Sequence, residues 1–248
     1  MPRVGTRKLH YMLAGSLERH GISIGRDNLF NLLSAYGLLV RRRRRKRVYT
    51  TDSNHPFKKY ANLIKDLQVQ RPNHLWVSDI TYIGLQDGFC YLSLVTDAYS
   101  RKITGYCLHP TLKKDGPVTA LQMALETLPA NLQQPLIHHS DRGLQYCCSQ
   151  YISLLENRSM AISMTEKGDP YENAIAERVN GILKNEFDLD KVFDSFEDAS
   201  LAVNTAIATY NNFRPHASCN YLTPNVAHQK MGALPLRWLP KKKKEVVV

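Results

Sequence analysis

Residues 135–146, with the sequence PLIHHSDRGLQY, place a carboxylate at the end of an apolar run and just before a glycine turn. The apolar run indicates a buried strand. A charge left unpaired at the end of a buried strand is costly, and a bound metal ion would remove that cost. Ligands of α/β sheets lie just beyond the carboxyl ends of the strands. Asp141 therefore indicates a metal site, provided that other carboxylates reach the same place.

The segments on both sides of this stretch predict a mixed α/β domain. LWVSDITYIGL (75–85) and FCYLSLVTDAYS (89–100) are rich in β-branched and aromatic residues, and the QDG between them indicates a hairpin turn. KITGYCLH (102–109) predicts a third strand. We expect two more strands, at 135–141 and 160–165, and helices at 116–129, 147–157, 171–187 and 195–212, the last ending before Pro215. Strands first and alternating helices afterwards are typical of a mixed sheet.

The excess positive charge is confined to the first quarter of the chain. The 248 residues have a net charge of +11. Residues 1–60 contain 14 Lys and Arg against three acids, which already gives +11, and the other 19 Lys and Arg are balanced by 19 acids. A polyanion such as DNA or RNA is the expected partner of this segment, and a solvated basic tail or contact with anionic lipid is the alternative.

Two short helices are predicted within this basic region. Residues 6–20 and 26–38 carry apolar side chains at helical spacing, and the short GISIG between them is typical of a helix-turn-helix. A run of basic residues follows, and we expect its side chains to contact DNA phosphates. The alternative is a linker that is only surrounded by solvent. The run consists of Arg41, Arg42, Arg43, Arg44, Arg45, Lys46 and Arg47.

The composition excludes several classes of protein. No run approaches the roughly 18 apolar residues that a membrane span needs, and the N-terminus lacks the apolar core of a signal peptide. The chain has five cysteines and no CxxC pair, which fits a reducing compartment better than a disulfide scaffold. We therefore expect a cytoplasmic protein that associates with the nucleoid through DNA and has no membrane partner.

Asp79 is the acid best placed to join Asp141. It lies in the middle of the predicted strand WVSDITY, where Asp is rare unless it is used. A satisfied Asp at a sheet edge is the alternative. Asp97 lies beside a turn, where an Asp is expected to bond to the backbone, so we interpret it as structural.

A third acid is expected from the helix predicted at 171–187. On this helix Asn173, Glu177 and Lys184 share one face, whereas Glu172 lies about 140° round from Glu177 and cannot point to the same place. An ordinary solvated helix Glu is the alternative for Glu177.

The blocks WVSDITY, HHSDRGLQY and DPYENAIAERVNGILKNE together resemble the three catalytic blocks of the retroviral-integrase-like DDE recombinases. More specifically, they resemble the second-reading-frame (OrfB) transposases of the bacterial IS-three family of insertion sequences. The 35 residues between Asp141 and Glu177 match the spacing of that family, and Lys184 matches its usual basic residue. DAYSRKITGY and YNNFRPHASCNYLTP resemble two further family blocks, so that the resemblance covers about residues 5–230.

This resemblance implies an RNase H-like fold, a mixed five-stranded sheet flanked by helices, preceded by a small all-α helix-turn-helix domain. It implies that Asp79, Asp141 and Glu177 bind two Mg²⁺ ions, for which Mn²⁺ can substitute. Water would attack the phosphodiester at the end of the element, and the freed 3′-hydroxyl would then attack target DNA. Lys184 would contact DNA near the reacting end, and Asn173 would support the metal site.

We divide the chain into a helix-turn-helix region with its basic run (1–47), a linker with one helix around Tyr60–Leu67 (48–71), a catalytic domain (72–235) and a basic tail (236–248). The expected partners are the terminal repeats of the element and its target DNA. We also expect self-assembly on DNA, and the product of an upstream reading frame as a fusion is a further candidate partner.

Other functions fit the sequence less well. The adjacent His139, Ser140 and Asp141 cannot converge as a serine-hydrolase triad. Zinc binding by the HisHis and CysCys pairs lacks the usual ligand spacing. A plain RNase H or Holliday-junction nuclease would not need the basic helix-turn-helix. The serious alternative is a DNA-binding repressor or an inactive transposase remnant, against which the intact set of three acids argues.

Overall fold

The computed structural model describes residues 1–40, 55–129, 134–166 and 173–235. The basic run Arg41–Arg47, the acid Glu172 and the predicted basic tail 236–248 therefore lie outside the described residues.

A mixed sheet with strand order β3-β2-β1-β4-β5 forms the centre of the molecule. The hairpin of β1 (Leu75–Leu85) and β2 (Gly88–Asp97) is antiparallel, and β3 (Ile103–His109) extends it. On the other side of β1, β4 (Ile137–Ser140) and then β5 (Ala161–Met164) run parallel. The five predicted strands are confirmed. A sixth, β6 (Val192–Phe193), pairs with the end of β1 and was not predicted, because two residues carry no periodicity.

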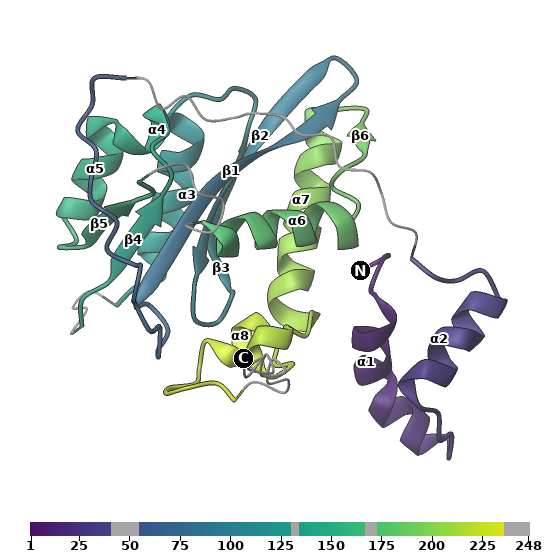
Figure 1. The fold of residues 1–248 in the computed structure, drawn as a ribbon. Helices are drawn as coiled ribbons and strands as arrows, with labels where there is room; N and C mark the ends of the chain where they lie inside the picture. The colour runs from purple at the N-terminus through teal and green to yellow at the C-terminus, as the bar shows by residue number, and fades with distance from the viewer. Residues whose placement is uncertain (41–54, 130–133, 167–172, 236–248) are drawn as a thin grey trace, which may run out of the picture.

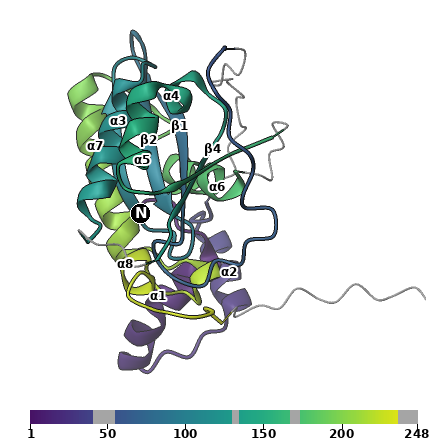
Figure 2. The same ribbon diagram turned by 90° about the vertical axis from the view of Figure 1, so that its left-hand side faces the viewer.

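Helices cover both faces of this sheet. In Figures 1 and 2, α3 (Asp115–Glu126) and α6 (Ala174–Glu186) lie on opposite sides of β1 and β2. The helix predicted at 147–157 is confirmed as α5 (Ser149–Glu156). A short helix that was not predicted, α4 (Leu144–Cys147), precedes it and is separated from it by Cys148, whose backbone is extended with φ −69° and ψ 147°. The last elements in the described part of the chain are α7 (Phe196–Phe213), the 3-10 turn η1 (Ala217–Cys219) and α8 (Pro224–Ala227).

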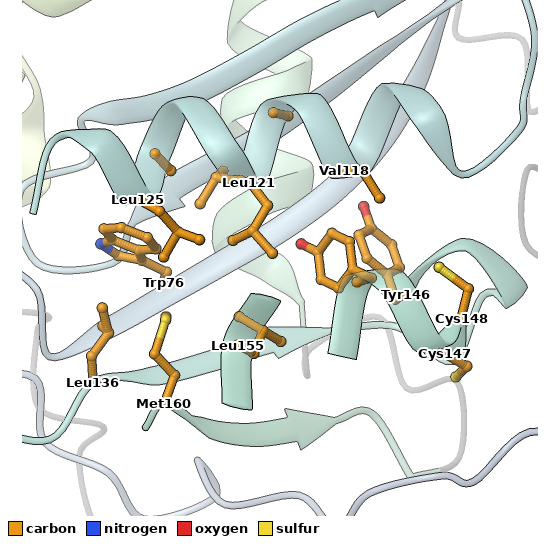
Figure 3. Close-up of a cluster of buried hydrophobic side chains, with 14 of the residues drawn as sticks. Trp76, Val118, Leu121, Leu125, Leu136, Tyr146, Cys147, Cys148, Leu155 and Met160 are labelled. Carbon is orange, nitrogen blue, oxygen red and sulfur yellow. The ribbon is translucent and has the colours of Figure 1, made fainter. Parts of the chain in front are cut away.

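Strand alternation divides the apolar side chains between two cores. Trp76 and Ile80 of β1 pack with α3, α4 and α5, and Figure 3 shows Trp76 between Leu125 of α3 and Leu136. Ile83, with the opposite parity, packs with α6 and α7 instead. Because successive strand residues point to opposite faces, Asp79 must face the same side as Ile83, which is the side of α6.

The two predicted N-terminal helices are confirmed as α1 (Thr6–Arg19) and α2 (Arg26–Ala35). This helical hairpin has very little core of its own: α1 has no buried residue, and in α2 only Leu29 is buried. Since most helix stability in proteins comes from tertiary packing, contacts with the rest of the chain matter for its position.

The helix predicted around Tyr60–Leu67 is wrong. Residues 58–64 form no helix or strand, and the carbonyl of Ala61 accepts a hydrogen bond at 3.3 Å from the backbone N–H of Met164 at the end of β5. The side chain of Asn62 accepts from the N–H of Ile64 at 3.0 Å, which competes locally with helix formation. A sheet edge and an Asn side chain have overridden a weak helical pattern.

The structural interpretation of Asp97 is supported by its contacts. Its carboxylate is fully buried and accepts hydrogen bonds from the backbone N–H of Asn73 and of Ser100 at 2.7 Å each, and from the Ser100 hydroxyl at 2.6 Å. All five cysteines are free thiols. Within the described residues, no helix is long and apolar enough to cross a membrane.

We predict that Gly105→Ala strongly destabilises the fold. A Cβ at Gly105 on β3 would lie 2.0 Å from the carbonyl oxygen of Ala120 and 2.7 Å from the nitrogen of Ala124, so that α3 must move away from the sheet. Overpacking of this kind costs about 1–3 kcal/mol or more. Urea denaturation checks the value against Gly15→Ala in α1, where nothing lies within 4 Å and a small stabilisation is expected. Equal effects of the two substitutions would contradict the prediction.

Candidate active site

The parallel pairing of β1 with β4 brings Asp79 and Asp141 together. Trp76 pairs with His138 and Val77 with His139, and the same register continued by two residues sets Asp79 beside Asp141. Neighbouring strands lie about 4.8 Å apart, and residues in register point to the same face. Two acids that are 62 residues apart in the sequence therefore meet at the sheet, as the sequence predicted.

The carboxylate of Asp79 is held by two donors. The side-chain amide of Asn180 donates to one oxygen at 2.8 Å, and the N–H of Ile80 donates to the other at 2.9 Å. Burial and the carboxylate of Asp141 nevertheless raise the pKa of Asp79 to about 7, with a smaller contribution from Glu177. A carboxylate whose charge is disfavoured by burial first and by a neighbouring acid second is a good candidate for binding a cation.

Asp141 is fixed by the turn that follows it. Its Oδ1 accepts a hydrogen bond at 2.9 Å from the N–H of Gly143, and a Cβ at Gly143 would lie only 3.0 Å from the same oxygen. The glycine of the HHSDRGLQY block thus lets the backbone approach the acid closely. His55 lies beside the same loop, since its Nε2 is 2.8 Å from the carbonyl oxygen of Arg142.

One face of α6 lies along β1 and carries the remaining predicted site residues. Asn173 precedes the helix and donates from its side chain to the carbonyl of Ser78 at 3.1 Å. Glu177 is in the first turn of α6 and is exposed to solvent. It is three residues before Asn180, on the same face, and so lies on the side of the helix that faces Asp79.

Asn180 is a site residue that the sequence reasoning missed. It is buried, and its amide makes the direct contact from α6 to Asp79. The signal was available, because Asn180 is spaced three residues from Glu177 and four from Lys184. Asn180 could therefore have been predicted by the same reasoning that singled out Asn173.

Lys184 extends this face towards the far end of β1. Its Nζ lies 3.7 Å from the ring centroid of Tyr82, at a cation–π distance. Burial lowers the pKa of Lys184 to about 8, and the negative charge of Asp79 opposes this shift. The ammonium group is therefore close enough to the acids to interact with them and partly removed from water.

A buried polar network supports the two strands beneath the acids. His138 contacts the hydroxyl of Ser78 at 2.8 Å and that of Tyr151 at 2.9 Å. Burial lowers the pKa of His138 to about 3, so the imidazole is neutral and structural near pH 7. The network ties β1, β4 and α5 together one residue before Asp79.

The carboxylates fit a hard divalent cation, which prefers oxygen ligands. The fit rests on the pair Asp79 and Asp141, whose mutual repulsion a cation would relieve. However, no three His, Cys, Asp or Glu side chains within the described ranges are close enough together to hold a metal ion. Glu177 thus lies near Asp79 and Asp141 but not close enough to complete a three-ligand metal site with them. The same finding leaves no zinc cluster at the HisHis and CysCys pairs.

Comparison with known proteins places this geometry in a family. Two models described as Integrase core domain match residues 69–170 and 158–224. The Insertion element IS600 uncharacterized 31 kDa protein of Shigella sonnei is 35% identical over 231 residues, which cover 91% of this chain and 81% of that protein. Transposase InsF for insertion sequence IS3A of Escherichia coli (strain K12) is 32% identical over 224 residues, covering 88% of this chain and 70% of that protein.

Two solved structures have the same fold. The simian T-cell lymphotropic virus intasome matches 96% of this chain and 79% of its own chain, with a TM-score of 0.55 and 18% identity. The HTLV-2 integrase catalytic core domain, solved in complex with magnesium, matches 64% of this chain and 97% of its own, with a TM-score of 0.50 and 20% identity. The chain belongs to the IS3-type family of DDE transposases and has the integrase-core, RNase H-like fold.

Proposed function

We propose that the chain cleaves the ends of an insertion sequence and joins the freed 3′-hydroxyl to target DNA, with Asp79, Asp141 and Glu177 as its metal-binding acids. The observation that carries the proposal is the pair of Asp79 on β1 and Asp141 just after β4, which the parallel pairing of these strands brings together. The pair faces a helix that carries Glu177 and Asn180. The family membership supports the same reaction.

The protein residues contribute positioning and charge to this reaction. Two Mg²⁺ ions, when bound, would offset negative charge on the transferring phosphate and on the attacking and leaving oxygens. Asn180 and the N–H of Ile80 fix the orientation of Asp79, and the N–H of Gly143 fixes that of Asp141. Lys184 would hold the phosphate backbone close to the acids. The neutral, buried His138 would take no proton from the attacking group.

The helical hairpin of α1 and α2, together with the basic run at 41–47, is proposed to bind the terminal repeats of the element. Charge supports this assignment, because the whole net charge of +11 lies in residues 1–60. We further propose assembly of several copies on DNA, since two ends of the element must be brought together. Fusion to the product of an upstream frame is a further proposal.

Substitution of each acid tests the catalytic assignment. We expect Asp79→Asn, Asp141→Asn and Glu177→Gln to reduce joining of the element's end DNA by at least about a thousandfold, while binding to that DNA is retained. The measurement is strand transfer in Mg²⁺ or Mn²⁺, with the chain alone and fused to any upstream frame.

Glu126→Gln on the exposed part of α3 is the matched control for these variants and should join normally. Near-normal joining by one acid variant would remove that acid from the site. Intact DNA binding without joining by any form of the unsubstituted protein would instead favour an inactive, DNA-binding remnant.

Lys184→Met should weaken DNA binding and joining together. The substitution keeps helix propensity and stem length but removes the charge beside Tyr82. If Lys184 contacts one phosphate, the slope of log affinity against log salt should become shallower by about 1, for specific and non-specific DNA alike. The check is a salt titration of DNA binding, with Lys184→Arg as the variant that retains the slope. An unchanged slope in Lys184→Met would mean that this lysine makes no phosphate contact.

Asp79→Asn should stabilise the metal-free protein. The raised pKa of about 7 means that Asp79 ionises in the unfolded chain first, so stability is lost as pH rises from about 4 to 7. Asn avoids this loss and can donate to Asp141. We expect a gain of roughly 1–4 kcal/mol above pH 7 in chelator, shrinking when Mg²⁺ is added.

Urea denaturation between pH 4 and 8 measures this effect. Asp97→Asn is the opposite control, because the buried carboxylate of Asp97 accepts three hydrogen bonds and its replacement should destabilise the protein. A metal-free Asp79→Asn variant that is less stable than the unsubstituted protein at pH 8 would show that the carboxylate pair is not strained.

A further inference from the structure

Glu186, the last residue of α6, is bound by cations from both ends of the chain. Arg214, from the FRPH block, donates from Nε to Oε2 at 2.7 Å and from Nη2 to Oε1 at 2.8 Å. Lys8 of α1 donates from Nζ to Oε1 at 2.6 Å. The side chains are only 1%, 13% and 18% exposed for Arg214, Glu186 and Lys8. None of these three residues belongs to the active site described above.

The two cations hold Glu186 with different strength. The Arg214 pair is bidentate and almost fully buried, and removing one partner of such a pair leaves an uncompensated buried charge. Burial alone would raise the pKa of Glu186, but the bonds from Arg214 and Lys8 outweigh it and lower that pKa. Burial and the like charge of Arg214 lower the pKa of Lys8. Arg214 thus makes the more buried, bidentate contact with Glu186, and Lys8 makes a single and more exposed one.

Three more contacts join the same two parts of the chain. Arg3 forms an ion pair with Asp188 at 2.7 Å, and its backbone N–H donates to the carbonyl of Glu186 at 3.3 Å. The rings of Tyr11 and Tyr221 lie 4.8 Å apart between centroids. All of these contacts join residues 3–11 to residues 186–221. In Figure 1 the N-terminus accordingly lies next to the end of α6.

We propose that Glu186 and Arg214 form the docking point that holds the N-terminal helical hairpin on the catalytic domain, so that DNA carried by the hairpin meets the catalytic acids in a fixed orientation. The second half of this statement rests on the proposed function. The hairpin has almost no core of its own, so a few contacts decide where it lies. Glu186 follows Glu177 by nine residues on one helix, or roughly 14 Å along its axis. A rigid α6 therefore links the hairpin to the third acid.

The docking also decides which side of the hairpin is free for DNA. Lys8 and Arg3 are occupied by acids of the catalytic domain and cannot neutralise phosphates at the same time. Arg19, at the end of α1, is exposed, and its Nε donates to the carbonyl of Gly15 in the same helix at 3.2 Å. DNA is therefore expected on the part of the hairpin that points away from Glu186.

Amide hydrogen exchange on the full chain without DNA tests the docking. In the double variant Arg3→Gln with Lys8→Met, residues 6–19 and 214–222 should both exchange severalfold faster, while β1 and α3 stay protected. Lys8→Arg, which keeps the charge, should exchange as the unsubstituted protein does. Arg19→Met removes one charge from the same helix and should change neither segment. Unchanged exchange at both segments in the double variant would overturn the docking point, whatever the protein does to DNA.

Joining kinetics test the positioning. At saturating end DNA, the double variant should join at least about tenfold more slowly, a change of 1.4 kcal/mol in barrier, while its affinity for the DNA changes less than the rate. The single variant Lys8→Arg, which keeps the charge, should join DNA at the rate of the unsubstituted protein. Equal rates in the double variant and the unsubstituted protein would refute the positioning. Absence of joining by the unsubstituted protein would instead refute the proposed function and leave the exchange result standing.

Discussion

The geometry of the site depends on the pairing of β1 with β4, which holds two acidic side chains close together despite their like charge. Parallel pairing of β1 with β4 sets Asp79 beside Asp141, and neither strand can slip without turning its apolar residues out of the core. Trp76 and Val77 on β1 are buried on opposite sides of the sheet just before Asp79, so the register is fixed from both faces. Hydrogen bonds from Asn180, Ile80 and Gly143 reduce the strain but do not remove it. Burial first, and the charge of Asp141 second, raise the pKa of Asp79 to about 7, and a bound cation would offset both costs of ionising it.

The two acids on strands and the acid on the helix differ in how firmly they are placed. Asp79 and Asp141 are each held by the backbone of the next residues, and the network of Ser78, His138 and Tyr151 fixes the strands below them. Glu177 stands in the first turn of α6 and is exposed. Its approach to the pair depends on the position of the whole helix. The proposed third ligand is thus the one that the backbone of the sheet does not hold.

Much of this could be predicted from the sequence, for identifiable reasons. The strands β1 to β5 and the helices α1, α2, α3, α6 and α7 were predicted from the composition and spacing of their apolar residues. Asp141 was expected at the carboxyl end of its strand, and its meeting with mid-strand Asp79 required only that the two strands be neighbours. The misses have physical causes. In the segment 60–67, Ala61 bonds to the end of β5 and the Asn62 side chain bonds to Ile64, and a helical pattern in a single sequence cannot show either contact. β6 exists only through its contact with β1. The pair of Glu186 with Arg214 joins residues 28 positions apart and has no local signal.

Helix α6 makes three separate sets of contacts, each from a different part of its surface. One face carries Asn173, Glu177, Asn180 and Lys184 along β1, and a second packs Val179, Ile182 and Leu183 into the core with α7. Glu186 lies about 160° round from Lys184 and binds Arg214 and Lys8. A substitution on any of these parts of α6 therefore removes a contact with another element, unlike a substitution on the solvent-exposed face of a surface helix. Under the docking proposed above, α6 is the direct structural connection between the hairpin at Glu186 and the turn that carries Glu177. Through this connection the proposed docking would let a helical hairpin with almost no core of its own affect the proposed chemistry at Glu177.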